Sequence, residues 1–92
     1  MNHQIERIMT TQEIKSKAFR VIDKVITLKA NVFNGCYSDK AELAQEEARL
    51  EGIKNWAIAN NQLQDIRNYF ASKTFGNHLQ FHAFEVSKFF NN

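Results

Sequence analysis

The sequence contains no proline, only three glycines and a single cysteine in 92 residues. Proline and glycine interrupt regular structure most strongly, so their scarcity leaves long segments free to be helical. The lone cysteine, Cys36, excludes an intramolecular disulfide and fits a reducing compartment. These absences predict an all-α fold, a bundle of three or four helices.

Long apolar runs are also missing. No stretch approaches the roughly 20 apolar residues needed to cross a bilayer, and the start of the chain lacks the apolar segment of a secretory signal. At 43% hydrophobic and 24% charged residues, the composition is that of a chain that folds rather than one that stays disordered. We therefore expect a single helical domain over residues 1–92, located in the cytoplasm and without a membrane span.

The clearest helix is predicted over residues 11–33. Thr10 and Glu13 have the spacing of a capping box, in which each side chain binds the backbone amide of the other residue. Apolar residues then recur at steps of three and four, as on the buried face of a helix; they include Ile14, Ala18, Val21, Val25, Leu28 and Val32. Residues 1–9 fall out of phase with this stripe, so we expect them to form an arm.

A turn should follow at residues 34–38, with Gly35 in the position after the helix that favours a positive φ. Ser38 or Asp39 should cap the next helix, and Asp39 and Glu42 repeat the capping-box spacing at its start. The end of that helix is ambiguous, because residues 39–74 can be interpreted as one long central helix or as two helices.

The two-helix interpretation ends the first helix at Asn60 and Asn61 and uses Asn61 as the cap of the next. The one-helix interpretation is favoured by register, because a set of apolar or small residues keeps a single phase across the break. These residues are Ala41, Ala48, Gly52, Ala59, Leu63, Ile66 and Phe70. The final break is predicted at Gly76, as the residue after a helix end, with Asn77 capping a last helix over residues 78–91.

The last helix carries aromatic side chains on two sides. Leu79, Ala83, Val86 and Phe90 form one stripe, while Phe81, Phe84 and the stem of Lys88 lie on nearly the opposite side. Aromatic residues dominate the centres of protein interfaces, so we predict that Phe81, Phe84 and Lys88 bind a partner. The alternative is that Phe81 and Phe84 fill the core of a tight bundle.

Two further surfaces have ordinary explanations. The small residues Ala41, Ala48, Gly52 and Ala59 would let another helix approach closely, either within the core or across a dimer seam. Lys17, Arg20 and Lys24 form a basic row that suits a solvated helix face, with contact to nucleic acid as the alternative.

Chemistry-bearing residues are few. His78, His82 and Glu85 have a spacing that permits metal binding, but we expect His82 to lie at the edge of the core and assign no metal site or cofactor. No combination of nucleophile, base and orienting residue is present, which argues against an enzyme.

The sequence thus predicts a small non-enzymatic protein-binding module. We expect it to regulate or inhibit a larger protein by occupying part of its surface, to form a homo-oligomer, and to resemble in size the inhibitors that phages and mobile elements often encode. The alternative is a small helical nucleic-acid-binding accessory or transcriptional regulator.

Overall fold

The structure is a computed structural model that describes residues 9–91, so most of the expected arm at residues 1–9 lies outside the described part. Four helices follow one another without strands in that part: α1 (Thr11–Phe33), α2 (Lys40–Ala59), α3 (Leu63–Ser72) and α4 (Asn77–Asn91). One turn of 3₁₀ helix, Tyr37–Asp39, precedes α2. The prediction of an all-α bundle is confirmed.

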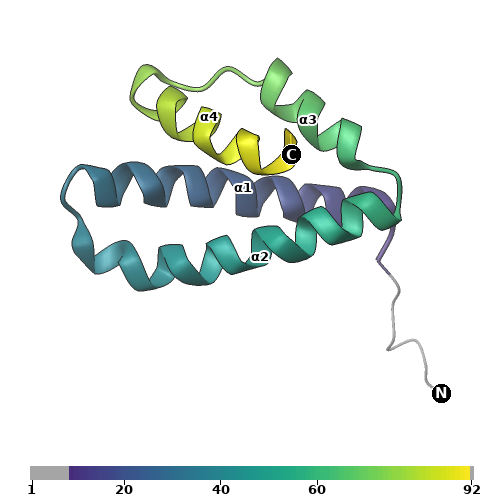
Figure 1. The fold of residues 1–92 in the computed structure, drawn as a ribbon, viewed down its shortest axis with the longest axis horizontal. Coiled ribbons are helices and arrows are strands. Elements are labelled where there is room, and N and C mark those ends of the chain that lie inside the picture. Colours follow the sequence, from purple (N-terminus) through teal and green to yellow (C-terminus); the bar gives the residue numbers. More distant parts are fainter. Residues whose placement is uncertain (1–8, 92) are drawn as a thin grey trace.

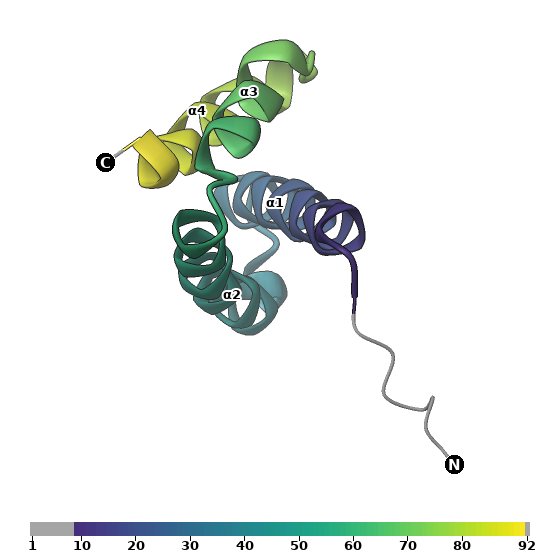
Figure 2. The ribbon, with the colours of Figure 1, turned by 90° about the vertical axis from the view of Figure 1, so that its right-hand side faces the viewer.

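Helix α1 lies at the centre of the bundle. It runs antiparallel to α2, and the hairpin of α3 and α4 packs on its other side (Figures 1 and 2). Buried apolar side chains from all four helices meet in one core; they are Ile22, Val25, Ile26, Leu50, Ala57, Ile66, Ala83, Val86 and Phe90. Three residues of the predicted stripe on α1 are buried, namely Ala18, Val25 and Leu28, while Ile14, Val21 and Val32 are half-buried.

Both ends of α1 form as the sequence predicts. The Thr10 hydroxyl accepts a hydrogen bond from the Glu13 amide at 3.1 Å, and the Glu13 carboxylate accepts one from the Thr10 amide at 2.9 Å. At the other end Gly35 has a φ of 106°, and the amides of Gly35 and Cys36 donate to Val32 and Asn31. This pattern is a Schellman motif, which satisfies the last carbonyls of the helix.

Residues 39–74 form two helices, so the favoured single long helix is wrong. Asn61 has a φ of 59°, and its amide donates to the Ile58 carbonyl while the Gln62 amide donates to that of Ala57 at 2.7 Å. These bonds make a second Schellman motif, with asparagine in the left-handed position that glycine usually takes. Asn61 thus ends α2, whereas the sequence interpretation made it the cap of α3.

The start of α2 also differs from the prediction. Asp39 precedes the helix but its side chain makes no capping bond to the backbone. The preceding 3₁₀ turn places Asp39 at φ −83° and ψ −3°, whereas a capping side chain needs extended backbone. Its carboxylate accepts a hydrogen bond from the Asn31 amide group of α1 at 3.2 Å instead.

The connection from α3 to α4 is longer than predicted. Helix α3 ends at Ser72, and Lys73 leaves it in an extended conformation with ψ 135°. Gly76 therefore does not follow a helix end, and its φ is not positive. Asn77 is the first residue of α4 rather than its cap.

Lys73 belongs to a polar cluster that joins α3 to α1. The Tyr69 hydroxyl lies 2.7 Å from Asp23 Oδ1, and the Lys73 ammonium lies 2.8 Å from Asp23 Oδ2 and 3.0 Å from the Tyr69 oxygen. The Tyr69 ring also stacks on Phe19, with centroids 4.1 Å apart. Burial raises the pKa of Tyr69, and the hydrogen bond to Asp23 raises the pKa of Lys73.

The carboxyl end of α4 is held by cations from two other helices. Lys54 of α2 donates to the Phe89 carbonyl, and Arg67 of α3 donates to the Phe90 carbonyl, each at 2.8 Å. Cations are favourable at this end of a helix, where the last carbonyls lack partners within the helix. These contacts fix α4 at its end, while Val86 and Phe90 anchor its inner side.

Candidate protein-binding surface on α4

The outward side of α4 presents Phe81, Phe84 and Lys88, a set that we call the aromatic face. Phe81 is 62% exposed and Phe84 is 59% exposed. At about 100° per residue they lie roughly 60° apart and opposite the buried Val86 and Phe90. The structure therefore overturns the alternative that Phe81 and Phe84 fill the core.

Lys88 extends this face along the helix. Its ammonium lies 4.8 Å from the centre of the Phe84 ring, within the range of a cation–π contact, and 3.5 Å from a Glu85 carboxylate oxygen. The ammonium itself is exposed, so the aromatic face ends in a positive charge.

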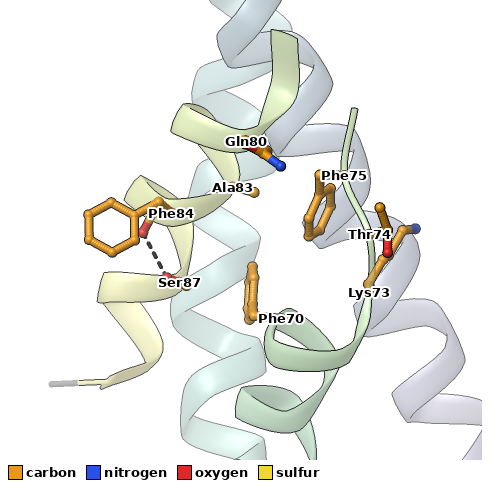
Figure 3. Close-up of a pocket in the computed structure, with 8 residues that line it drawn as sticks. All are labelled: Phe70, Lys73, Thr74, Phe75, Gln80, Ala83, Phe84 and Ser87. Atoms are coloured by element: carbon orange, nitrogen blue, oxygen red, sulfur yellow. Dashed lines mark hydrogen bonds between the residues drawn. The ribbon is translucent and has the colours of Figure 1, made fainter. Parts of the chain in front are cut away.

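An open hollow of about 440 Å³ lies between α4 and the segment that follows α3 (Figure 3). The rings of Phe70 and Phe75 face it from one side and Ala83 lies across from them, while the Phe84 ring points away from the hollow to the outer side of α4. Apolar surface thus continues from the aromatic face around one edge of α4.

A second hollow, of about 290 Å³, lies on the opposite edge of α4 and contains a buried histidine. We call it the His82 hollow; its lining residues are Lys29, Val32, Phe33, Leu43, Phe81, His82 and Glu85. His82 is only 7% exposed, and the rings of Phe33 and Phe81 approach it edge-on with centroids 5.3 and 5.4 Å away. Phe81 therefore belongs both to the aromatic face and to this hollow.

Phe33 is the residue of this region that the sequence analysis missed. It is the last residue of α1, and its side chain is 75% exposed. Its proximity to Gly35 could have indicated a position at the end of the bundle, where fewer neighbours cover a side chain.

The structure places His82 at the edge of the core, as predicted, but does not join it with His78 and Glu85 in a metal site. Within residues 9–91 no group of three His, Cys, Asp or Glu side chains is arranged to hold a metal ion. His78 is exposed, whereas His82 is buried.

The three residues of the basic row on α1 differ in whether they form ion pairs. Lys24 binds Glu42 of α2 at 2.7 Å and lies 3.9 Å from Glu46, and the hydrogen bond to Glu42 raises the pKa of Lys24. Lys17 and Arg20 are exposed, and neither forms an ion pair with another residue in the described part. They border a shallow hollow together with Arg49 of α2.

The small residues of α2 do not pack in the core. Ala41, Ala48, Gly52 and Ala59 are all exposed, and a Cβ added to Gly52 would meet nothing within 4 Å. The buried side of α2 is instead formed by residues such as Leu50 and Ala57. The expectation of core packing is wrong, because the small residues lie on the side of α2 that faces away from α1.

No helix within residues 9–91 has both the length and the apolar character needed to span a membrane. Comparison of the chain with protein-family models, with curated proteins and with solved structures finds no match in any of the three.

Proposed function

We propose that the protein is a small non-enzymatic binding module that regulates or inhibits a larger protein by occupying part of its surface. The observation that carries this proposal is the exposure of Phe81 and Phe84 on the outward side of α4. Large apolar side chains that gather on a surface are typical of interaction sites, and aromatic rings are frequent anchors of binding energy.

The way α4 is held also supports binding. Its inner side is buried through Val86 and Phe90, and its last carbonyls accept bonds from Lys54 and Arg67. A surface carried by an element that is already packed loses little conformational freedom when it binds, so more of the contact energy remains as affinity.

Self-association is part of the proposal. The outward side of α2 between Ala41 and Ala59 carries small residues, which would let a helix of a second copy approach closely. A small domain buries a modest fraction of its surface by itself, so a second copy would add to its stability.

The decisive experiment changes Phe81 and Phe84 together to serine. We expect the thermal midpoint to fall by only a few degrees, because both rings are exposed, while binding to the partner recovered from the native cell weakens at least tenfold. Calorimetry and equilibrium binding would measure the two effects, and sedimentation would measure self-association.

Ile58→Ser is the matched control, since Ile58 is 57% exposed but lies on α2. It should leave partner binding unchanged. An F81S/F84S protein that is unfolded, or one that is folded and binds its partner as tightly as the wild type, would refute the proposal.

A nucleic-acid-binding function is the second candidate. It is favoured by Lys17 and Arg20, which are exposed, form no ion pair with residues 9–91 and lie beside Arg49. Recovery of nucleic acid without a protein partner, lost on nuclease treatment and on changing Lys17 and Arg20 to glutamate, would support this candidate.

A further inference from the structure

His82 is a buried polar side chain that forms no hydrogen bond with the residues that the structure describes. It is nine-tenths buried, and neither ring nitrogen bonds to another residue within 9–91. Buried polar groups are nearly always paired with protein atoms or ordered water, so an exception calls for an explanation. A neutral imidazole offers one donor and one acceptor.

The surroundings of His82 form a site that is open to solvent. The His82 hollow has a volume of about 290 Å³, and Val32, Leu43 and the two phenylalanines make its walls mainly apolar. The rings of both phenylalanines contact the imidazole. A cavity of about 150 Å³ is large enough to bind benzene, so this hollow has room for one aromatic side chain.

We propose that the His82 hollow binds a tyrosine side chain of a protein partner, with the ring between Phe33 and Phe81 and the hydroxyl bonded to the His82 imidazole. This proposal rests on the proposed function and deepens it. It names one side chain of the partner, a tyrosine, and places it in the hollow beside the aromatic face.

The chemistry of the hollow selects tyrosine among the common anchors of interfaces. Edge-to-face and offset contacts with Phe33 and Phe81 suit an aromatic ring. The imidazole, which has no hydrogen-bond partner within residues 9–91, favours an occupant that also carries a polar group. A phenolic hydroxyl both donates and accepts, so it can pair with either nitrogen of the neutral ring. Phenylalanine would leave the imidazole unpaired, which costs affinity.

The two charged residues that line the hollow, Lys29 and Glu85, each have an ion-pair partner that does not line it. Lys29 lies 3.8 Å from Glu47, and Glu85 lies 3.5 Å from Lys88. A neutral occupant therefore fits better than an anionic side chain, which would have to compete with Glu47 for Lys29.

The experiment uses the full chain and two probes that differ by one hydroxyl, N-acetyltyrosinamide and N-acetylphenylalaninamide. Each is titrated while NMR follows the imidazole carbon-bound protons of the histidines. We expect the tyrosine amide to bind at least fivefold tighter than the phenylalanine amide and to shift the His82 signals most. Equal affinities, or no shift at His82 up to the solubility limit of both probes, would overturn the proposal.

Variants then locate the effect. His82→Phe should remove the preference for the tyrosine amide, whereas the matched control His78→Phe should keep it, because His78 is exposed and does not line the hollow. Phe33→Ala should weaken both probes several-fold and keep the preference, and it serves as the test if the His82 variant fails to fold. Retention of the preference in a folded His82→Phe protein would overturn the proposal.

The outcome is separable from that of the proposed function. The probes test the hollow in the isolated protein, without any partner. Phe84 does not line the hollow, so loss of partner binding in a Phe84→Ser variant would report on the aromatic face alone.

Discussion

Helices α1 and α4 both pack an apolar side into the same core, but their outward sides differ. The charged residues of α1 are largely used within the fold: Lys15 binds Asp65, Lys24 binds Glu42, and Asp23 binds Tyr69 and Lys73. On α4 the outward side carries Phe81 and Phe84, whose rings contribute little to the buried core.

The difference supports the binding surface that we propose on α4. A charge that already has a neighbour must give up that contact before it can bind anything else, and surface ion pairs contribute little to stability in any case. An exposed phenylalanine gains by losing contact with water. The outward side of α4 is therefore the surface with more free energy to gain from burial.

The largest expected effect contrasts the two sides of α4. Phe90→Ala should lower the free energy of unfolding by about 3–5 kcal/mol, because the ring is fully buried and its removal leaves a cavity. Phe84→Ala should lower it by less than about 0.5 kcal/mol, as expected for an exposed side chain. Urea unfolding of both variants measures the difference. Similar losses would show that α4 does not have distinct inner and outer sides.

A smaller effect should follow when the end of α4 is released. Arg67→Ala removes the bond to the Phe90 carbonyl and should cost about 1–2 kcal/mol, with faster hydrogen exchange in the last turn of the helix. Arg49→Ala is the control, because Arg49 is exposed and its contact with Glu46 is long, at 3.8 Å. An Arg67 variant that behaves like the control would mean that α4 is held by its apolar side alone.

The smallest effect concerns the polar cluster on α1. Tyr69→Phe should cost about 1 kcal/mol, since Asp23 loses one hydrogen bond and keeps Lys73. Tyr37→Phe should have no measurable effect, because that side chain is exposed. Equal stability of the two variants would show that the hydroxyl of Tyr69 adds nothing to the joint between α1 and α3.

The same cluster should make stability fall at alkaline pH. The folded protein raises the pKa of both Tyr69 and Lys73 above their ordinary values of 10.0 and 10.5, so it holds their protons more tightly than the unfolded chain does. This contribution is complete below about pH 10 and is lost as the pH rises through the folded pKa values. Tyr69→Phe should weaken the pH dependence; an unchanged profile would contradict the assignment.

Short-range signals in the sequence determined the elements themselves. The capping box of Thr10 and Glu13, the spacing of Val25 and Leu28 and the turn at Gly35 all depend on residues within a few positions of one another. The two sides of α4 were also visible in its spacing, because a helix fixes which residues share a side. The exposure of Phe81 was not visible, since that depends on where other helices lie.

Only the tertiary structure decided which side of α2 is buried. The shared register that favoured one long helix grouped Ala48, which is exposed, with Ile66, which lies in the core. That group therefore mixed residues from the exposed side of α2 with residues from the buried side of α3. Helix α2 carries apolar or small residues all around, and its packing on α1 selected the side that holds Leu50 and Ala57.

Contacts between residues distant in the chain decided both the helix break at Asn61 and the burial of His82. Asparagine fits a helix interior, a cap or a left-handed helix end, and the requirement that α3 pack with α4 selects the last. The imidazole of His82 is buried, and one of the rings in contact with it is that of Phe33, at the far end of α1. Local sequence thus determined where helices form, while contacts between residues distant in the chain decided which sides they bury and which they leave exposed.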